Sequence, residues 1–416
     1  MPKDADRSPI ILPPQSEFRG ESEQNPALLS PRPKRRRTGF FVSLTLVSLT
    51  AIVILTGLYI HFGSISTFSP VQKATVSSEQ TGTFIITPYN SSQLSALTHL
   101  VDRMSYKELA SLYVAHMSLD EKLGQMIMTE SEQNNYLDDL NYMITQLHVG
   151  GMIMYESHLQ TASQARATTS LSQQNAKIPL LISVDEEGGL YVHRLEKIYG
   201  ARPGPTEISQ TGSLIYDQQQ GVKLAHDILS IGLNTDLAPD VDVSIIPGYD
   251  TVDRTFGTTA ASVIKYAGPY IEAMQGHGLI ACLKHYPGGL GNTPYDAHDI
   301  LPTDNRSRDQ IYATELAPYN TFINSTNPLM RPAMIMSTDV LMPAIDPNMP
   351  AELSHKFMTD ILRTQFGYDG VVITDALYMG GISDRWSEPE AAVLAIQAGN
   401  DMILSLIHIS EPTRPY

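Results

Sequence analysis

The feature that most constrains this chain is an alternation, from about residue 98 onward, of short apolar runs with longer amphipathic stretches. The apolar runs are LGQMIM (123–128), GGMIMY (150–155), PLLISV (179–184), NTDLAP (234–239), LIACLKH (279–285), PAMIMST (332–338), GVVITD (370–375) and NDMIL (400–404). Strands without polar alternation, separated by helices, are typical of a parallel sheet that is covered on its outer face. Eight of them favour an α/β fold of the (β/α)8, TIM-barrel type over an open doubly wound sheet.

The start of the first helix before these runs is marked by a capping signal. Ser118 and Glu121 have the S-x-x-E spacing of a capping box, which predicts a helix beginning there. The run LGQMIM (123–128) follows so closely that it has two interpretations, a strand or the end of that helix.

The N-terminal region predicts a membrane anchor. Five basic residues stand directly before the uncharged stretch Gly39 to Ile60, which is long enough to cross a hydrocarbon core of about 30 Å. We therefore expect a cytoplasmic disordered tail (1–38), a transmembrane signal-anchor (39–61) and an extracytoplasmic linker (62–97) before the barrel (98–404). A cleaved signal peptide is the alternative, which a mature N-terminus beyond residue 63 would establish.

Charge and cysteine content exclude several classes of protein. The net charge is −16 although residues 1–38 carry eight Lys or Arg against five Asp or Glu, so the remainder is strongly acidic. An acidic domain is a poor partner for nucleic acid. The single cysteine, Cys282, excludes a disulfide framework and a CxxC metal site.

Ionisable residues follow five of the predicted strands directly. They are Asp185, Asp240 with Asp242, Lys284 with His285, Asp339, and Asp375. Strand carboxyl ends meet at the mouth of a (β/α)8 barrel, so these side chains are expected to line one site. The sequence has no P-loop and no H-x-x-x-H or H-E-x-x-H spacing, and we predict no cofactor and no metal. Carboxylates with a few cations suit a neutral polyhydroxylated ligand.

Five motifs in order resemble the catalytic barrel of family 3 glycoside hydrolases. They are DEEGG (185–189), GLNTDLAPDVDV (232–243), RTFG (254–257), KHYPGGLGNTPYDAH (284–298) and GYDGVVITDALYMGGI (367–382). The resemblance runs from about Met117 to Leu404, and the bacterial β-N-acetylglucosaminidase branch is the most similar. It implies a retaining exo-glycosidase that acts on a carbohydrate and removes terminal β-linked N-acetylglucosamine.

The resemblance also implies roles for individual residues. Asp375 matches the catalytic nucleophile, which forms a covalent glycosyl-enzyme intermediate. His298 matches the acid/base residue of that branch, with Asp296 orienting its ring; a histidine ordinarily titrates near pH 6.5 and can both give and take a proton at neutral pH. The positions that match substrate-binding residues are Asp185, Arg194, Arg254, Lys284 and His285.

Two departures from the family pattern concern the loop that carries His298. The glycine-rich segment 288–291 is one residue longer than usual, and Ala297 stands where Ser or Thr is common. These departures concern the resting position of the His298 side chain more than its identity as the acid/base residue. We expect the glycines to let the loop fold over the sugar and bring His298 from solvent to the glycosidic oxygen.

Each residue also has a structural alternative, and the function has others. Asp375 is also suited to a helix N-cap, His298 with Asp296 to a solvated loop, Asp185 to a turn and Arg194 to a surface salt bridge. A β-glucosidase, an enzyme that uses phosphate as acceptor, and a non-catalytic membrane-anchored sugar-binding barrel are the alternatives for the whole chain.

The last residues form a separate prediction. LSLIHISEPTRPY (404–416) resembles the translation of a sequencing-library adapter, and it holds two prolines where a helix covering the eighth strand is expected. We therefore expect residues 405–416 to be non-native and the barrel to be truncated at its C-terminus.

Overall fold

The computed structural model describes residues 105–131, 133–246 and 253–405. The chain divides into two compact units, 1–113 and 114–416. The predicted tail, membrane anchor and linker (1–97) lie outside the described residues, as does the predicted tail 405–416 apart from Ser405. No helix among the described residues is long and apolar enough to cross a membrane.

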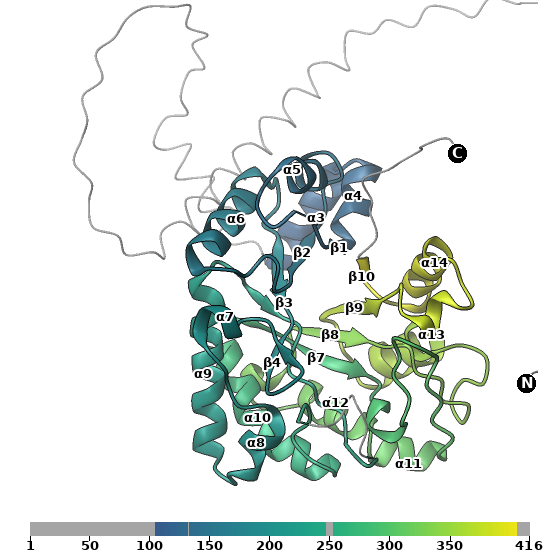
Figure 1. Cartoon of the computed structure of the whole chain (residues 1–416). Helices are drawn as coiled ribbons and strands as arrows, with labels where there is room; N and C mark the ends of the chain where they lie inside the picture. Colours follow the sequence, from purple (N-terminus) through teal and green to yellow (C-terminus); the bar gives the residue numbers. More distant parts are fainter. Residues whose placement is uncertain (1–104, 132, 247–252, 406–416) are drawn as a thin grey trace, which may run out of the picture. The chain divides into compact units, whose positions relative to one another are not determined.

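Eight strands of the second unit form a closed parallel barrel, which confirms the predicted fold class (Figure 1). Around the wall their order is β1-β10-β9-β8-β7-β6-β3-β2. Their bounds are β1 Ile127–Thr129, β2 Gly151–Met154, β3 Leu181–Val184, β6 Thr235–Asp236, β7 Ile280–Tyr286, β8 Met334–Ser337, β9 Val371–Ala376 and β10 Met402–Ser405. The first and last strands close the wall, with Ile127 opposite Ile403.

The run LGQMIM (123–128) contains both structures that were predicted as alternatives for it, the end of a helix and a strand. The helix α4 (Leu119–Gln125) takes its first half, and β1 begins at Ile127. The predicted capping box is confirmed, because the Ser118 hydroxyl accepts from Glu121 N at 3.1 Å and Glu121 Oε2 accepts from Ser118 N at 2.9 Å.

The barrel interior is packed by apolar side chains, several of them methionines. On β7, Cys282 points into an inner cluster that also holds Met128, Met334 and Met336, and none of these four side chains is more than 3% exposed. Successive side chains of a strand point to opposite faces, so Ala281 and the residue after Cys282 join the outer layer instead. Because both faces are buried, the strand sequences lack polar alternation.

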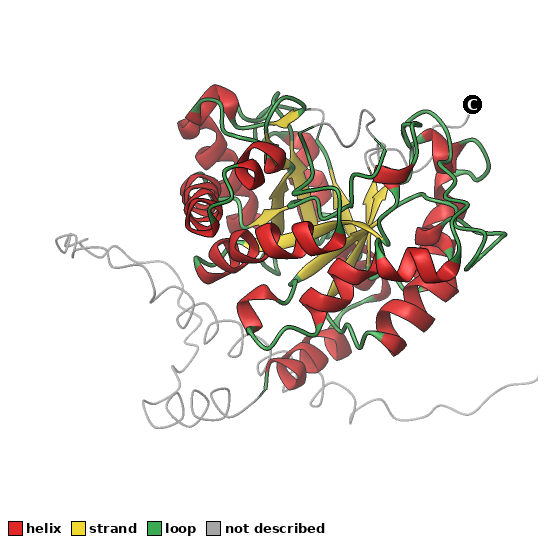
Figure 2. Ribbon diagram, turned by 90° about the horizontal axis from the view of Figure 1, so that it is seen from below, coloured by secondary structure: helices red, strands yellow, loops and turns green. Residues whose placement is uncertain are grey.

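Helices surround the strands on the outside (Figure 2). Those of the second unit are α4, α5 Asp138–Thr145, α6 Ala162–Asn175, α7 Glu196–Tyr199, α8 Pro205–Gln210, α9 Leu214–Ser230, α10 Ala260–Gly276, α11 Arg308–Ala313, α12 Leu316–Ile323, α13 Gly380–Ser383 and α14 Glu388–Ala398. Short 3₁₀ turns are η1 Leu290–Asn292, η2 Pro328–Met330 and η3 Ala351–Leu353, and η4 Lys356–Gln365 is a π-helix. Among the amphipathic stretches that alternate with the apolar runs, those at 218–232, 259–278 and 353–367 correspond to α9, α10 and η4.

A two-stranded antiparallel hairpin, β4 (Glu186–Gly188) with β5 (Val192–His193), follows β3 and was not predicted. Its turn depends on Gly189, whose φ is +73° and whose Cβ, if present, would lie 2.2 Å from Asp253 Oδ2. The same oxygen accepts from Leu190 N at 3.0 Å. The hairpin is thereby held against the residue that precedes Arg254.

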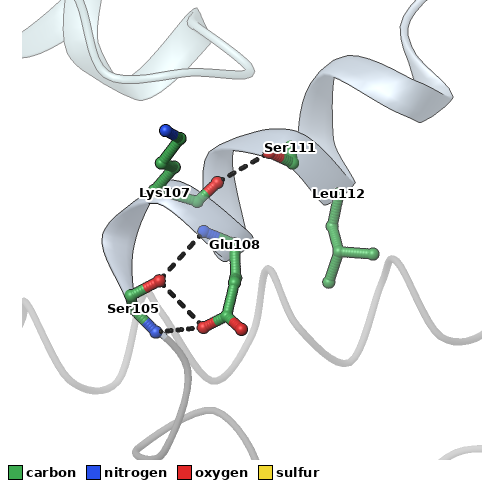
Figure 3. A pocket seen from close by; sticks show the side chains of 5 residues that line it. All are labelled: Ser105, Lys107, Glu108, Ser111 and Leu112. Carbon is green, nitrogen blue, oxygen red and sulfur yellow. Dashed lines mark hydrogen bonds between the residues drawn. The ribbon is translucent and has the colours of Figure 1, made fainter.

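The described part of the first unit, residues 105–113, comprises Ser105 and most of α3 (Tyr106–His116), and it carries a pocket, shown in Figure 3. Its lining residues are Ser105, Lys107, Glu108, Ser111 and Leu112. Glu108 Oε2 accepts from Ser105 N at 2.7 Å, and the Ser105 hydroxyl accepts from Glu108 N at 3.3 Å. This reciprocal pairing is a capping box at the start of α3, so these groups serve the helix rather than a ligand.

Candidate active site

The five polar strand ends predicted to meet do so on five consecutive strands of the wall, β3, β6, β7, β8 and β9. Asp185 follows β3 and Asp375 lies near the end of β9. Lys284 and His285 lie within β7, between those two. Because all these strands are parallel, their carboxyl ends open onto the same mouth.

Lys284 and Arg254 share one buried carboxylate, that of Glu187. Lys284 Nζ lies 2.6 Å from Glu187 Oε1 and 2.5 Å from Asp185 Oδ1. Arg254 binds Glu187 in a bidentate way, with its Nε 2.8 Å from Oε2 and its Nη2 2.8 Å from Oε1. Arg254 Nη2 also lies 3.4 Å from His285 Nε2. The structure therefore brings four of the predicted substrate-binding residues into one network.

The charges in this network set one another's ionisation. Burial alone would raise the pKa of Glu187, but the Arg254 guanidinium and the Lys284 ammonium outweigh it and hold that pKa well below its ordinary value. For Lys284, burial favours the neutral amine, whereas the carboxylates of Asp185 and Glu187 outweigh burial and raise its pKa. Burial lowers the pKa of His285. The network therefore holds two permanent cations and a neutral imidazole at neutral pH.

Glu187 was absent from the predicted site residues, although the sequence held a signal for it. Asp185 and Glu187 stand two apart in extended chain, so their side chains lie on the same side. Glu186 faces the other way, where its Oε1 forms an ion pair with Arg202 Nε at 3.0 Å. Because side chains alternate along DEEGG, the first and third carboxylates lie at the mouth with Lys284, whereas the second lies on the opposite side with Arg202.

Asp375 is held by two hydrogen bonds. Thr338 Oγ1 donates to Asp375 Oδ2 at 3.1 Å, and Ala376 N donates to Asp375 Oδ1 at 2.8 Å. Beside it, Glu352 on η3 is 1% exposed. Burial, and then the charges of Asp339 and Asp375, raise the pKa of Glu352 well above its ordinary value. A buried carboxyl group whose surroundings favour the protonated form therefore adjoins the predicted nucleophile, and sequence reasoning missed it.

His298 and Asp296 form a pair on the loop after β7. His298 Nδ1 lies 2.8 Å from Asp296 Oδ1, which also accepts from His298 N at 2.8 Å. The His298 side chain is 58% exposed. The loop is attached to the start of α13, because Gly380 N donates to His298 O at 2.9 Å and Gly381 N to Ala297 O at 3.1 Å. The pair is thus linked through the backbone to the segment that follows Asp375, while its ring is largely in solvent.

Arg194 lies apart from the Lys284–Arg254 network in its hydrogen bonding. Its Nη1 is 2.5 Å from Glu156 Oε1, and its guanidinium lies over the Tyr155 ring, 5.4 Å from the centroid. The side chain is 24% exposed. This is the salt bridge considered as its structural alternative, and a substrate contact for Arg194 stays a prediction.

Asp240 and Asp242 converge on His285, although the sequence showed no metal-binding spacing. His285 Nδ1 lies 3.1 Å from Asp242 Oδ2 and 3.9 Å from Asp240 Oδ2. One ligand atom from each of the three residues lies within 4.8 Å of the others, and all three residues are buried. Two carboxylate oxygens and an imidazole nitrogen are a donor set that suits a divalent cation.

Comparison with known proteins gives the family. Residues 118–411 match the model of the glycosyl hydrolase family 3 N-terminal domain, which is well over half of the chain. The chain belongs to glycosyl hydrolase family 3. The predicted resemblance to this family is thereby confirmed.

Individual family 3 proteins show how much of their length this chain spans. It is 31% identical to β-hexosaminidase A of Pseudoalteromonas piscicida over 65% of this chain and 48% of that protein. It is 33% identical to β-hexosaminidase LpqI of Mycobacterium tuberculosis over 70% of this chain and 74% of that protein. The structure of a family 3 β-N-acetylglucosaminidase from Paenibacillus sp. str. FPU-7 matches with a TM-score of 0.66 and 33% identity, covering 70% and 55% of the two chains.

Proposed function

We propose that this family 3 chain is a retaining exo-glycosidase that hydrolyses terminal β-linked N-acetylglucosamine. The observation that carries the proposal is the backbone attachment of the loop bearing the His298–Asp296 pair to Gly380 and Gly381, just after Asp375. A carboxylate and a proton-transfer group on adjoining segments are what a two-step displacement needs. The β-hexosaminidase and β-N-acetylglucosaminidase relatives support the sugar assignment.

In the first step, Asp375 attacks the anomeric carbon while His298 protonates the departing glycosidic oxygen. With Nδ1 paired to Asp296, the ring nitrogen that transfers the proton is Nε2. The sugar is then esterified to Asp375. In the second step His298 takes a proton from water, which attacks the anomeric carbon and releases the sugar with retained configuration. Movement of the loop must first bring the exposed ring to the bond.

The Lys284–Arg254 network is proposed to hold the sugar. Asp185 accepts hydrogen bonds, and Lys284 and Arg254 donate them, so hydroxyl and acetamido groups find charged partners of both signs. Glu187 keeps both cations in place by binding each of them.

The test is the aryl N-acetyl-β-glucosaminide turnover of the wild type and of Asp375→Asn. We expect kcat to fall by about 10³-fold or more, with sugar binding retained, because an amide cannot form the ester intermediate. Asp369→Asn, an exposed aspartate before β9, is the matched control and should keep wild-type turnover. Faster hydrolysis of the aryl β-glucoside would favour a β-glucosidase. A sugar-1-phosphate product would identify phosphate as the acceptor, and sugar binding without wild-type turnover would favour the sugar-binding barrel.

We further propose that residues 39–61 anchor the protein in the cell membrane, with the N-terminus cytoplasmic and the barrel extracytoplasmic. The support is the sequence itself: a basic cluster followed by an uncharged stretch of membrane-spanning length. Expression without residues 1–61 should move the activity from the membrane fraction to the soluble one. A wild-type mature N-terminus beyond residue 63 would contradict the anchor.

A further inference from the structure

Asp240, Asp242 and His285 form a cluster of which the proposed glycosidase mechanism uses only His285, through its contact with Arg254 in the sugar-binding network. Each of the three residues offers one possible metal-ligand atom, and these atoms lie within 4.8 Å of one another. Among the described residues, this is the group of three or more His, Cys, Asp or Glu residues that meets this condition. Asp240 and Asp242 follow β6, and His285 comes from the neighbouring strand β7. His285 thus lies on a strand, whereas the two aspartates lie in the segment after β6, where Asp240 forms a β-bridge with Lys284.

Asp240 supplies a second, independent observation. Its Oδ1 accepts from Asp242 N at 2.8 Å, whereas its Oδ2 accepts no hydrogen bond within the described part of the chain. The side chain is 1% exposed, and Oδ2 points to the cluster, 3.9 Å from His285 Nδ1. A buried carboxylate oxygen without a donor is unfavourable, so a ligand of positive charge would stabilise it.

The neighbouring cations are already engaged. Arg254 binds Glu187 through two nitrogens, and Lys284 contacts both Asp185 and Glu187. Both cations are thus held by carboxylates outside the cluster.

We propose that Asp240 Oδ2, Asp242 Oδ2 and His285 Nδ1 bind a divalent cation that accepts mixed oxygen and nitrogen ligands, of which Zn²⁺ is the representative. Tetrahedral ligands at about 2.0–2.1 Å from zinc lie about 3.3 Å apart. The ligand atoms that face His285 Nδ1 are 3.1 and 3.9 Å from it, so small side-chain shifts close the site. Three protein ligands leave a fourth position open.

Binding of the cation changes the contact between His285 and Arg254. A metal on Nδ1 requires the ring proton to lie on Nε2, which then cannot accept from Arg254 Nη2, 3.4 Å away. The contact between the cation site and the proposed sugar-binding network is thereby lost. Because Arg254 belongs to the network proposed to hold the sugar, the cation should weaken sugar binding and so inhibit by raising KM. This consequence rests on the proposed function.

Zinc binding to the full, untagged chain tests the site without any turnover. Isothermal titration with Zn²⁺ should give one tight equivalent for the wild type. Asp240→Asn should weaken it at least 10-fold, whereas His298→Ala should leave it unchanged and so excludes the exposed Asp296–His298 pair as the site. Absence of tight binding to the wild type, equal binding by Asp240→Asn, or loss of binding in His298→Ala overturns the proposal.

A crystal soaked with Zn²⁺ gives an answer that does not depend on the folding of a variant. An anomalous peak at about 2.0–2.2 Å from the three ligand atoms supports the site. A peak only elsewhere, or no peak, overturns it. Because neither experiment uses a sugar, an inactive protein that binds zinc here would refute the glycosidase proposal and leave the cation site standing.

Discussion

At the scale of single residues, Glu187 is the carboxylate on which both cations of the mouth depend. It is fully buried and touches Arg254 with both oxygens and Lys284 with one. Removing one member of a buried ion-paired group leaves the others without compensation, which costs more than the pair itself contributes. The substrate-binding cations are therefore positioned by a residue that need not touch the sugar.

Glu187→Gln should weaken both stability and sugar binding. The amide keeps the shape but not the charge, so Arg254 and Lys284 lose their shared counter-ion. We expect unfolding to be easier by about 3 kcal/mol and KM to rise more than kcat falls. Thermal unfolding and steady-state kinetics measure the two effects. Glu196→Gln on α7, whose side chain is 52% exposed, is the control; equal behaviour of the two variants would contradict the role of Glu187.

Sequence reasoning reached most of the residues of the site but not their partners. Asp185, Lys284 and His285 were found because ionisable groups at strand ends are unusual. Glu352 follows no strand, so no local pattern placed it beside Asp375. Its neighbours are set by the return of the chain after β8, which lies beyond the reach of periodicity or spacing.

At the scale of elements, the loop carrying His298 and the helix α13 are joined by close backbone contact. Gly381 packs so tightly there that an added Cβ would lie 1.9 Å from Asp339 Oδ2. Its own amide donates to Ala297 O in the loop. Any shift of α13 is therefore transmitted to the residue before His298.

Gly381→Ala should reduce turnover through the loop. The methyl group forces α13 away from Asp339, which breaks the amide contact with Ala297 and displaces His298. We expect kcat/KM to fall by about 10–100-fold with a folded protein by circular dichroism. Gly276→Ala, at the end of α10, is the matched control because its Cβ would meet only Leu329 Cδ1 at 3.6 Å. Unchanged turnover in Gly381→Ala would show that the loop does not need this anchor.

The barrel strands could be predicted because they are buried on both faces. Runs such as GMIM (151–154) are therefore short and apolar throughout, as a buried strand requires. The hairpin β4–β5 could not be predicted, since DEEGGLYVH (185–193) has no apolar pattern and its strands are paired for only a few residues. The division of LGQMIM between α4 and β1 was likewise hidden, because apolar residues occupy both the helix end and the strand.

At the scale of the whole molecule, buried carboxyl groups make stability depend on pH. Burial raises the pKa of Glu186 to about 7, although the Arg202 guanidinium opposes it. Burial also raises the pKa of Asp236 well above its ordinary value. Such groups hold protons in the folded state that the unfolded chain has already lost. Their contribution to stability is present below the unfolded pKa and is lost as pH rises to the folded one.

Glu186→Gln should therefore change the pH profile of unfolding. Between about pH 4.5 and 7, we expect the stability of the wild type to fall relative to the variant by at most about 3 kcal/mol, because the amide has no proton to lose. Melting temperatures of both proteins across that range measure the difference. Glu207→Gln, an exposed site on α8, should run parallel to the wild type. Parallel profiles for Glu186→Gln would contradict the assignment.

The thiol of Cys282, the single cysteine of the chain, can be used to measure how often the barrel opens. Cys282 is buried inside the ring of strands, where burial raises the pKa of its thiol well above the ordinary value. A disulfide reagent can react with it only when strands part far enough to admit solvent. Its rate of labelling therefore follows opening of the barrel, and a sugar or cation bound at the mouth would slow it.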